Sequence, residues 1–275
     1  MSTLTALIRK LWTFGLRQAW CAMFGGIMLG AIVFTKYVEL PFLSRYDWLF
    51  VVAVLTQVGM LVFRLERLHE AATIVLFHLV GLGMELFKTS GAIGSWHYPE
   101  DSIIRLGTVP LFSGFMYAAV GSYIARSWRV MQLSFKPYPS RWLTWILAVA
   151  IYINFFTHHY IWDLRYVLFV ATFWLYKKTV VSFVLNRAVH RMPLLVAFFL
   201  IALFIWIAEN IGTYTTAWLY PGQEDAWHVV SLHKLGSWML LMIISFIMVE
   251  TMLYMRTRLH PAAAKDVLGK SSKTR

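Results

Sequence analysis

Two glutamates that end strongly apolar stretches are each followed by the same types of residue. In both places a carboxylate stands four residues before a threonine and is then followed by Trp-x-Tyr-Pro. The members are Glu85, Thr89, Trp96, Tyr98 and Pro99 in the first copy, and Glu209, Thr213, Trp218, Tyr220 and Pro221 in the second. Because five residue types recur in one order, we interpret the two copies as an internal repeat.

The two carboxylates could carry acid–base chemistry. A charged group near hydrocarbon costs about 2.5 kcal/mol or more unless it is paired or hydrated, so Glu85 and Glu209 are functional candidates. If they face each other across a cleft, their repulsion separates the two pKa values, and one can donate a proton while the other accepts one. The alternative is structural: each glutamate caps its own loop, and Glu85 pairs with Lys88 three residues later.

The aromatic residues of the repeated motif fall where a membrane protein meets water. Trp and Tyr form belts at that interface, but the same rings could line the mouth of a pocket and hold an apolar ligand or a cation. We therefore predict a site in which Glu85 and Glu209 are the catalytic residues. Its predicted pocket residues are His78, Thr89, Trp96, Tyr98, Thr213, Trp218, Tyr220 and Lys234.

Histidines suggest two further hypotheses. His78 precedes Glu85 by seven residues, so the two share one helix face and could relay protons; a buried histidine that bonds one helix carbonyl is the alternative. Five other histidines fall near the predicted outer face: His97, His158, His159, His228 and His233. Their spacing fits no zinc motif. We expect no metal site and no cofactor.

The composition is that of a membrane protein. Of 275 residues, 59% are hydrophobic and 14% are charged, against about 25% charged in soluble domains. The net charge of +12 comes from cations at the ends of apolar stretches, and no groove-reading motif accompanies it, so we expect no nucleic-acid partner. The single cysteine, Cys21, excludes an internal disulfide. The expected partners are membrane lipids and a hydrophobic small molecule.

Eight apolar stretches approach the length of a membrane span, which is roughly 20 residues. They lie at about 18–36, 47–63, 70–88, 107–126, 141–157, 162–177, 193–212 and 230–254. We predict an all-α polytopic membrane protein with eight transmembrane helices in two parallel four-helix repeats. Matching motifs that begin at Asp47 and Asp163 support the repeat. Since four helices return the chain to one side, the repeats would be related by a pseudo-two-fold axis along the membrane normal.

The predicted organisation has four parts. A first repeat at 1–126 is followed by a cytoplasmic linker at 127–140, a second repeat at 141–256 and a disordered basic tail at 257–275. Alternate connections and the two termini hold 19 of the 25 Lys and Arg residues. The positive-inside rule therefore places both termini in the cytoplasm and the repeated motif at the outer face.

Four segments resemble a known family. They are Glu85–Thr89, Gly94–Pro99, Val109–Arg126 and Ala208–Thr213. Over essentially its whole length the sequence resembles the bacterial YoaT-like integral membrane proteins, a family without an assigned activity. The resemblance implies an eight-helix protein of the bacterial inner membrane.

A fainter resemblance connects the loop region of each half to the membrane carotenoid cyclases and hydratases. Gly94–Tyr98 and Val109–Leu111 match their outline of a helix-end acid, an aromatic loop and a proline that opens the next span. Where the cyclases carry paired acids, this chain has Leu111, Phe112 and Ser113, which argues against cyclisation itself.

Three functions follow from these patterns. The first is an enzyme-like pocket near the outer face that binds or modifies a lipidic or isoprenoid substrate, with Glu85 and Glu209 as acid and base. The second is a proton-coupled secondary transporter, which parallel repeats and an intramembrane His78 would suit. The third is a structural membrane protein without a small ligand. The sequence leaves the oligomeric state open.

Overall fold

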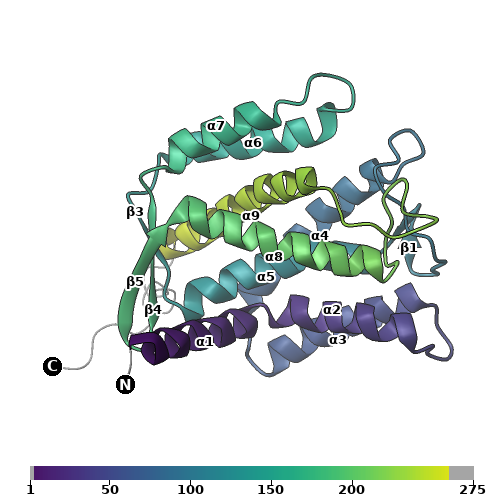
Figure 1. Cartoon of the computed structure of the whole chain (residues 1–275), viewed down its shortest axis with the longest axis horizontal. Helices are drawn as coiled ribbons and strands as arrows, with labels where there is room; N and C mark the ends of the chain where they lie inside the picture. Colours follow the sequence, from purple (N-terminus) through teal and green to yellow (C-terminus); the bar gives the residue numbers. More distant parts are fainter. Residues whose placement is uncertain (1–2, 260–275) are drawn as a thin grey trace.

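A computed structural model describes residues 3–259 of the chain. Nine helices and five short strands occur in this range (Figure 1). The helices are α1 (Thr3–Cys21), α2 (Met23–Tyr37), α3 (Arg45–Val62), α4 (Leu68–Lys88), α5 (Phe112–Val130), α6 (Arg141–Thr157), α7 (Arg165–Tyr176), α8 (Leu194–Tyr214) and α9 (Leu232–Leu259). The strands are β1 (Arg105–Leu106), β2 (Val109–Pro110), β3 (Ser134–Lys136), β4 (Val180–Leu185) and β5 (Ala188–Pro193).

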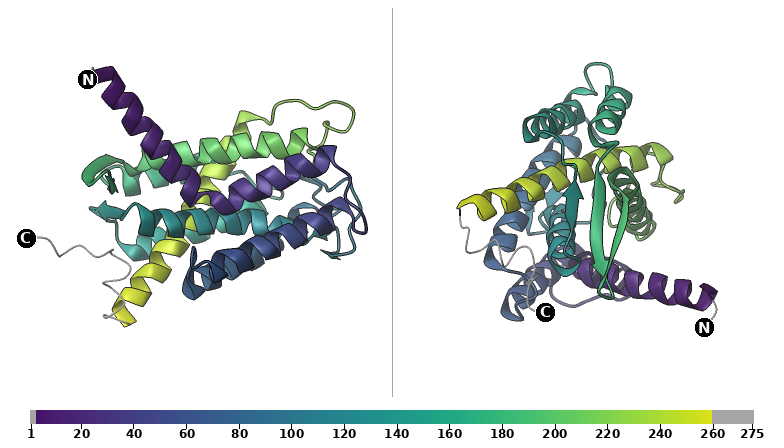
Figure 2. Two further views of the ribbon diagram at one scale, coloured as in Figure 1. Left: turned by 90° about the horizontal axis from the view of Figure 1, so that it is seen from below. Right: turned by 90° about the vertical axis from the view of Figure 1, so that its left-hand side faces the viewer.

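The helices extend between two ends of the molecule (Figure 1). Strands β3, β4 and β5 lie at one end, which we call the sheet end. The loops 89–111 and 215–231 lie at the opposite end, which we call the loop end. The described chain begins at the sheet end, and α9 finishes there (Figures 1 and 2).

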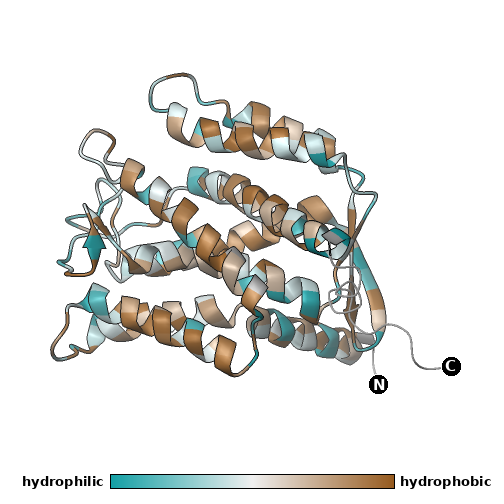
Figure 3. Ribbon diagram, turned by 180° about the vertical axis from the view of Figure 1, so that it is seen from behind, coloured by the Kyte–Doolittle hydropathy of each residue, from teal (hydrophilic) through white to brown (hydrophobic). Residues whose placement is uncertain are grey.

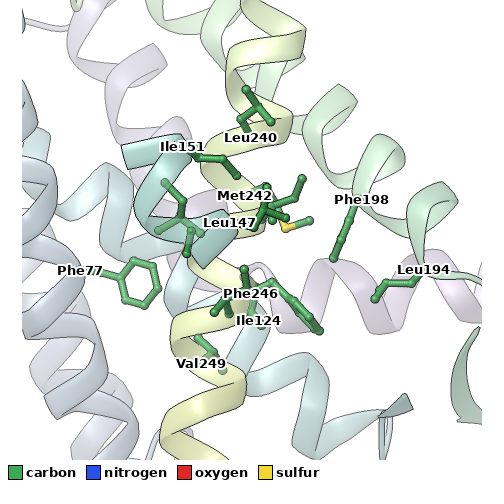
Figure 4. Packing of buried hydrophobic residues seen from close by; sticks show 14 of the residues in the cluster. Phe77, Ile124, Leu147, Ile151, Leu194, Phe198, Leu240, Met242, Phe246 and Val249 are labelled. Carbon is green, nitrogen blue, oxygen red and sulfur yellow. The ribbon is translucent and has the colours of Figure 1, made fainter. Parts of the chain in front are cut away.

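The main hydrophobic core lies between α4, α5, α6, α8 and α9, with Phe246 of α9 near its centre (Figure 4). Two glycines allow α4 and α5 to approach closely. A Cβ atom on Gly81 would lie 2.6 Å from the ring of Tyr117, and one on Gly121 would lie 2.8 Å from the ring of Phe77. This contact holds Tyr117 of α5 beside the last turns of α4.

Four helices in the described range are long and apolar enough to cross a membrane: α3, α4 from Glu70, α8, and α9 to Arg258. Hydrophobic residues colour long stretches of the helices in Figure 3, and large apolar side chains are exposed on α3, α4 and α8, among them Leu55, Val75 and Phe204. Helix α8 shows this most clearly, because its mean hydropathy is 2.4 while only 22% of its most apolar window is buried. Apolar faces of this size are stable against lipid rather than water, so the membrane character expected from composition is supported.

The number of spans differs from the prediction of eight. Each predicted apolar stretch does contain a helix, but α6 has 17 residues and α7 only 12. At 1.5 Å per residue α7 is about 18 Å long, well short of a hydrocarbon core of about 30 Å. Four spans are therefore present by length and composition in residues 3–259, or up to five if one bent pair counts as a span. Eight spans are not confirmed.

The bent pair consists of α1 and α2, which meet at an angle of 78° (Figure 2). The first predicted span, 18–36, includes this bend and is therefore not one straight helix. The bend falls at Ala22, whose φ of −87° and ψ of 12° interrupt the helical geometry. On the first two-thirds of α1 large apolar side chains are exposed, among them Leu7, Leu11 and Trp12.

An antiparallel sheet at the sheet end was not expected from the sequence. Strand β4 pairs with β3 on one side and with β5 on the other. The β4–β5 hairpin turns through Asn186 and Arg187, whose φ values are 51° and 64°; positive φ at both central residues is typical of a type I′ turn. Buried Val181, Phe183 and Leu185 alternate with less buried neighbours along β4.

The sheet also includes part of the predicted linker. Segment 127–140 contains the last turn of α5 and strand β3, and β3 pairs with β4. Of the predicted tail, 257–275, only residues 257–259 are described, and they belong to α9. The remainder of that prediction lies outside the described residues.

At the loop end, Asp47 attaches the loop that follows α4 to the start of α3. Its carboxylate accepts hydrogen bonds from the backbone N–H groups of Ile103, at 3.0 Å, and Ile104, at 2.8 Å. The hydroxyls of Ser44 and Ser102 donate to it as well, each at 2.7 Å. The residue is fully buried. An anion with four donors needs no counter-ion, so Asp47 has a structural role.

We expect Asp47→Asn to lower the midpoint of thermal unfolding of the detergent-solubilised protein by about 5 °C. The amide places an N–H group where buried backbone donors need an acceptor, and each donor left unpaired costs about 1–3 kcal/mol. Exposed Asp101 provides the control, since Asp101→Asn should leave the midpoint unchanged. Equal midpoints for both variants would show that Asp47 does not hold this loop.

Candidate functional site

The two repeated Trp-x-Tyr segments pair with each other at the loop end. The N–H of His97 donates to the carbonyl of Leu219 at 3.0 Å, and the N–H of Leu219 donates back to the carbonyl of His97 at 3.0 Å. The pair forms one antiparallel bridge. In such a pair the residues on either side of the central one project to one common face. The bridge therefore directs two Trp and two Tyr side chains the same way.

Those four side chains bind the two glutamates. Glu85 Oε2 accepts hydrogen bonds from Trp96 Nε1, at 2.9 Å, and from the Tyr98 hydroxyl, at 2.7 Å. Its other oxygen, Oε1, accepts one from the Tyr117 hydroxyl at 2.8 Å. Glu85 is 4% exposed. Both oxygens of this buried carboxylate are thus occupied by neutral donors.

Glu209 has the same type of environment with one donor fewer. Its Oε1 accepts hydrogen bonds from Trp218 Nε1, at 2.8 Å, and from the Tyr220 hydroxyl, at 2.5 Å. Glu209 is 5% exposed. Its second oxygen, Oε2, accepts no hydrogen bond from the side chains or backbone of residues 3–259. The two carboxylates therefore differ in their remaining capacity to bind a proton or a ligand.

The phenols that bind them stay protonated. Burial, followed by the charge of Glu85, raises the pKa of Tyr98 well above its ordinary value. Burial and the charge of Glu209 do the same to the pKa of Tyr220. Both hydroxyls are consequently permanent hydrogen-bond donors at physiological pH.

Both glutamates line one cavity of about 940 Å³. At the loop end its wall includes Trp96, Tyr98, Trp218, Tyr220 and Lys234 as well. From there the cavity continues between the helices to Phe14, Met131 and Phe183 at the sheet end, and most of this wall is apolar. The volume lies within the range of about 300–1,000 Å³ that is usual for ligand sites.

Three basic residues also line the loop end of the cavity: Lys88, Arg165 and Lys234. The Lys234 ammonium lies over the ring of Tyr220, 4.0 Å from its centroid, and 5.6 Å from the centroid of Trp96. Cations are attracted to aromatic faces in this way. The guanidinium of Arg165 pairs with Asp163 at 3.1 Å.

Lys88 is held by two histidines. Its Nζ lies 2.7 Å from His159 Nε2 and 3.4 Å from His158 Nε2. His158 Nδ1 lies 2.9 Å from the carbonyl of Asn154; a carbonyl only accepts, so Nδ1 carries the proton and Nε2 is free to accept from Lys88. Burial, then the charge of Lys88, lowers the pKa of His159 to about 4. Neutral imidazoles therefore accept from the buried ammonium.

Three residues of the predicted pocket do not line the cavity: His78, Thr89 and Thr213. His78 packs against the ring of Phe115, 4.6 Å between centroids, and its buried Nδ1 has no hydrogen-bond partner in the described range. No hydrogen bond joins it to Glu85, whose three donors are aromatic side chains. His78 therefore packs against Phe115, and neither a relay to Glu85 nor the expected bond to a helix carbonyl is seen in the described range.

The two threonines have local roles at the helix ends. Thr89 Oγ1 donates to the carbonyl of Glu85 at 2.8 Å. Thr213 Oγ1 donates to the carbonyl of Asn210 at 3.3 Å and accepts from Trp227 Nε1 at 3.1 Å. The remaining predicted residues, which are the two glutamates, the four aromatic residues and Lys234, all line the one cavity.

Sequence reasoning missed several residues of the site. Tyr117 lies on α5, far from either copy of the motif, and nothing in the local pattern ties it to Glu85. Lys88 was considered as a partner of Glu85, but it faces His158 and His159 instead. The available signal was that the two histidines stand shortly before Asp163 and Arg165 in the sequence. Within the described part of the chain no group of three or more His, Cys, Asp or Glu could hold a metal ion.

Comparison with known proteins places the chain in a family. The model for "Protein of unknown function (DUF817)" matches residues 10–246. The chain belongs to the DUF817 family. It is 44% identical over 248 residues to "Uncharacterized protein YoaT" of Bacillus subtilis (strain 168), an alignment that covers 89% of this chain and 92% of that protein. The predicted YoaT-like membership is confirmed. No solved structure gives a significant match.

We expect Gly212→Ala to disrupt the Glu209 site. A Cβ atom on Gly212 would lie 2.2 Å from the Trp218 ring, so the indole must move away from the carboxylate. The midpoint of thermal unfolding should fall by several degrees, and the near-ultraviolet circular dichroism of tryptophan should change. Gly83 lies within helix α4 and has nothing within 4 Å of its Cβ position. Gly83→Ala should therefore be neutral or stabilising, and the same loss in both variants would refute the steric explanation.

His159 should make the stability depend on pH. An unfolded histidine has a pKa of about 6.5, whereas the pKa of His159 in the fold is about 4. Between these values the unfolded chain binds a proton that the folded chain does not, so stability falls as pH falls. The decrease in unfolding midpoint from pH 7 to pH 4.5 should be smaller in His159→Gln than in the wild type. Exposed His228 provides the control: His228→Gln should keep the wild-type slope.

Proposed function

We propose that this DUF817 protein is a multi-pass protein of the bacterial inner membrane that binds, and by acid–base chemistry modifies, a lipidic substrate of the isoprenoid type. The observation that carries the proposal is the cavity of about 940 Å³ with both Glu85 and Glu209 in its wall. Its apolar length can accommodate a hydrocarbon chain, and the charged residues of its wall gather at the loop end. Such a division is typical of ligand sites.

The two carboxylates have different roles in this proposal. Both oxygens of Glu85 are occupied by three neutral donors, which fix its orientation, so it is the positioned member of the acid–base pair. Glu209 has an oxygen that no residue in the described range occupies, so it can exchange a proton with a bound ligand. In one direction the carboxyl proton of Glu209 moves to a ligand atom; in the reverse direction a proton of the ligand moves to the Glu209 carboxylate. Trp96, Tyr98, Trp218 and Tyr220 orient the acids as well as forming the wall.

The proposal includes an internal repeat and a topology. Two observations support the repeat: the antiparallel bridge is centred on equivalent residues, His97 and Leu219, and the pairs α2–α3 and α6–α7 lie on opposite sides of α4, α5, α8 and α9 (Figures 1 and 2). The repeat then consists of four helices in each half, α2–α5 and α6–α9. With the basic sheet end in the cytoplasm, the carboxylates lie toward the outer face.

Transport is the second candidate, and one observation favours it. The cavity has wall residues at both ends of the molecule, as a route across a membrane requires. A proton-coupled carrier would, however, need polar groups along that route, and His78 does not line it. The mostly apolar wall between the two ends suits a bound hydrocarbon chain better than a moving ion.

The test compares the lipids and pigments of four bacterial strains by mass spectrometry. They lack the protein, or carry the wild type, Glu209→Gln or Glu39→Gln. We expect at least one lipid to depend on the protein and its turnover to fall by about 100-fold or more in Glu209→Gln, since general acid–base groups contribute 10²–10⁴. Glu39 is exposed beyond α2, so Glu39→Gln should behave as the wild type. An identical profile with and without the protein would rule out the enzymatic function.

A further inference from the structure

The loop end of the cavity contains two buried or half-buried lysines whose charge no carboxylate neutralises by direct contact. In the described part of the chain, neither Lys88 nor Lys234 forms an ion pair. Glu85 and Glu209, which line the same wall, accept their hydrogen bonds from tryptophan and tyrosine instead. The site therefore holds two glutamates and two lysines, which are equal in number but form no ion pair with each other in the described chain.

Lys234 has the largest unused capacity. An ammonium can donate three hydrogen bonds, yet its Nζ makes only the two aromatic contacts, with Tyr220 and Trp96. No hydrogen bond joins its ammonium to another residue in the described range, 3–259. A buried ammonium without a hydrogen-bond acceptor is costly to keep out of water. An anion bound in the cavity would supply the missing acceptor.

Lys88 provides a second donor on the same wall. It is 3% exposed, and two neutral imidazoles take two of its three possible hydrogen bonds. Arg165, the third cation of the wall, uses its guanidinium on Asp163 and on the carbonyl of His233. The two lysines, with Arg165 nearby, form what we call the cationic cluster.

We propose that the ligand of the cavity is an amphiphile with an anionic head group, which the cationic cluster binds at the loop end while its hydrocarbon chain extends toward the sheet end. The inference rests on the proposed lipidic ligand and specifies its chemistry. A carboxylate or a phosphate meets the requirement equally, because either accepts charge-assisted hydrogen bonds from Lys234 and Lys88. Bound there, the head group holds the chain beside Glu209.

The test uses three probes that share one oleoyl chain and differ in the head group. They are 1-oleoylglycerol, which is neutral, oleate at pH 8, which is a carboxylate, and 1-oleoyl-lysophosphatidic acid, which is a phosphate. Dissociation constants are measured by native mass spectrometry on the full-length protein in maltoside micelles. For the wild type we expect at least one anionic probe to bind 10-fold or more tightly than 1-oleoylglycerol. The order of the two anionic probes then distinguishes a carboxylate ligand from a phosphate ligand.

Lysine variants connect the preference to the cluster. Lys234→Met should remove most of the anionic preference and leave the affinity for 1-oleoylglycerol within twofold, whereas Lys234→Arg should keep the preference. Lys36 lies at the same end of the molecule, outside the cavity wall, and its Nζ donates to the Thr216 hydroxyl at 2.8 Å. Lys36→Met should therefore behave as the wild type, which excludes a general effect of net charge.

The outcomes separate the two proposals. If the three probes bind the wild type equally well, the anionic head group is refuted, while a lipid-binding cavity stands. If Lys36→Met loses the preference as strongly as Lys234→Met, the cationic cluster is not its source and the inference fails. Ala197→Trp places a large side chain on the apolar wall of the cavity. If no probe binds the wild type, and Ala197→Trp leaves the lipid profile of the bacterial strain unchanged, the lipidic ligand and the inference are both refuted.

Discussion

Burial of two carboxylates at the ends of membrane helices is the constraint on which the loop end depends. A buried carboxylate must receive hydrogen bonds, because an unpaired charge in an apolar medium is prohibitively costly. Glu85 and Glu209 obtain theirs from tryptophan and tyrosine in the loops that follow α4 and α8. Each loop is thereby fixed to the helix before it, and the main-chain bridge between His97 and Leu219 fixes the loops to each other. Members of that network form part of the cavity wall at this end.

The same network explains why a structural and a chemical role are compatible. Neutral donors orient a carboxylate without pairing it with a cation, so the second oxygen of Glu209 remains available to a ligand. Because the glutamates accept from aromatic donors, the ammonium of Lys234 is left without a carboxylate partner in the described chain. A glutamate–lysine ion pair would have left no such unpaired ammonium in the cavity wall. Tyr117 makes the environments of the two glutamates unequal, since it gives Glu85 a third donor for which Glu209 has no counterpart in the described chain. That single phenol is what distinguishes the saturated acid from the open one.

Local sequence patterns predicted part of this arrangement, for physical reasons. The glutamates stand out because charge is rare at the end of an apolar helix, and the aromatic residues stand out because their order recurs. Tyr117, Lys88 and His158 could not be assigned, since their contacts depend on how helices distant in sequence pack. The bend at Ala22 and the sheet were also missed. The hairpin turn at Asn186 and Arg187 lacks the glycine that usually marks a type I′ turn, and a short helix such as α7 has the same apolar composition as a full span.

The bridge between the loops also bears on how much their sequences can vary. Its two hydrogen bonds use main-chain atoms only, so they impose a register and not an identity; histidine faces leucine across it without consequence. The approach to the bridge is not fixed in length either, because Trp96 follows its glutamate by eleven residues and Trp218 by nine. A shift of one residue within the paired segment is different, since it would turn both rings of that loop to the opposite face. Insertions are thus tolerable before the bridge and not inside it.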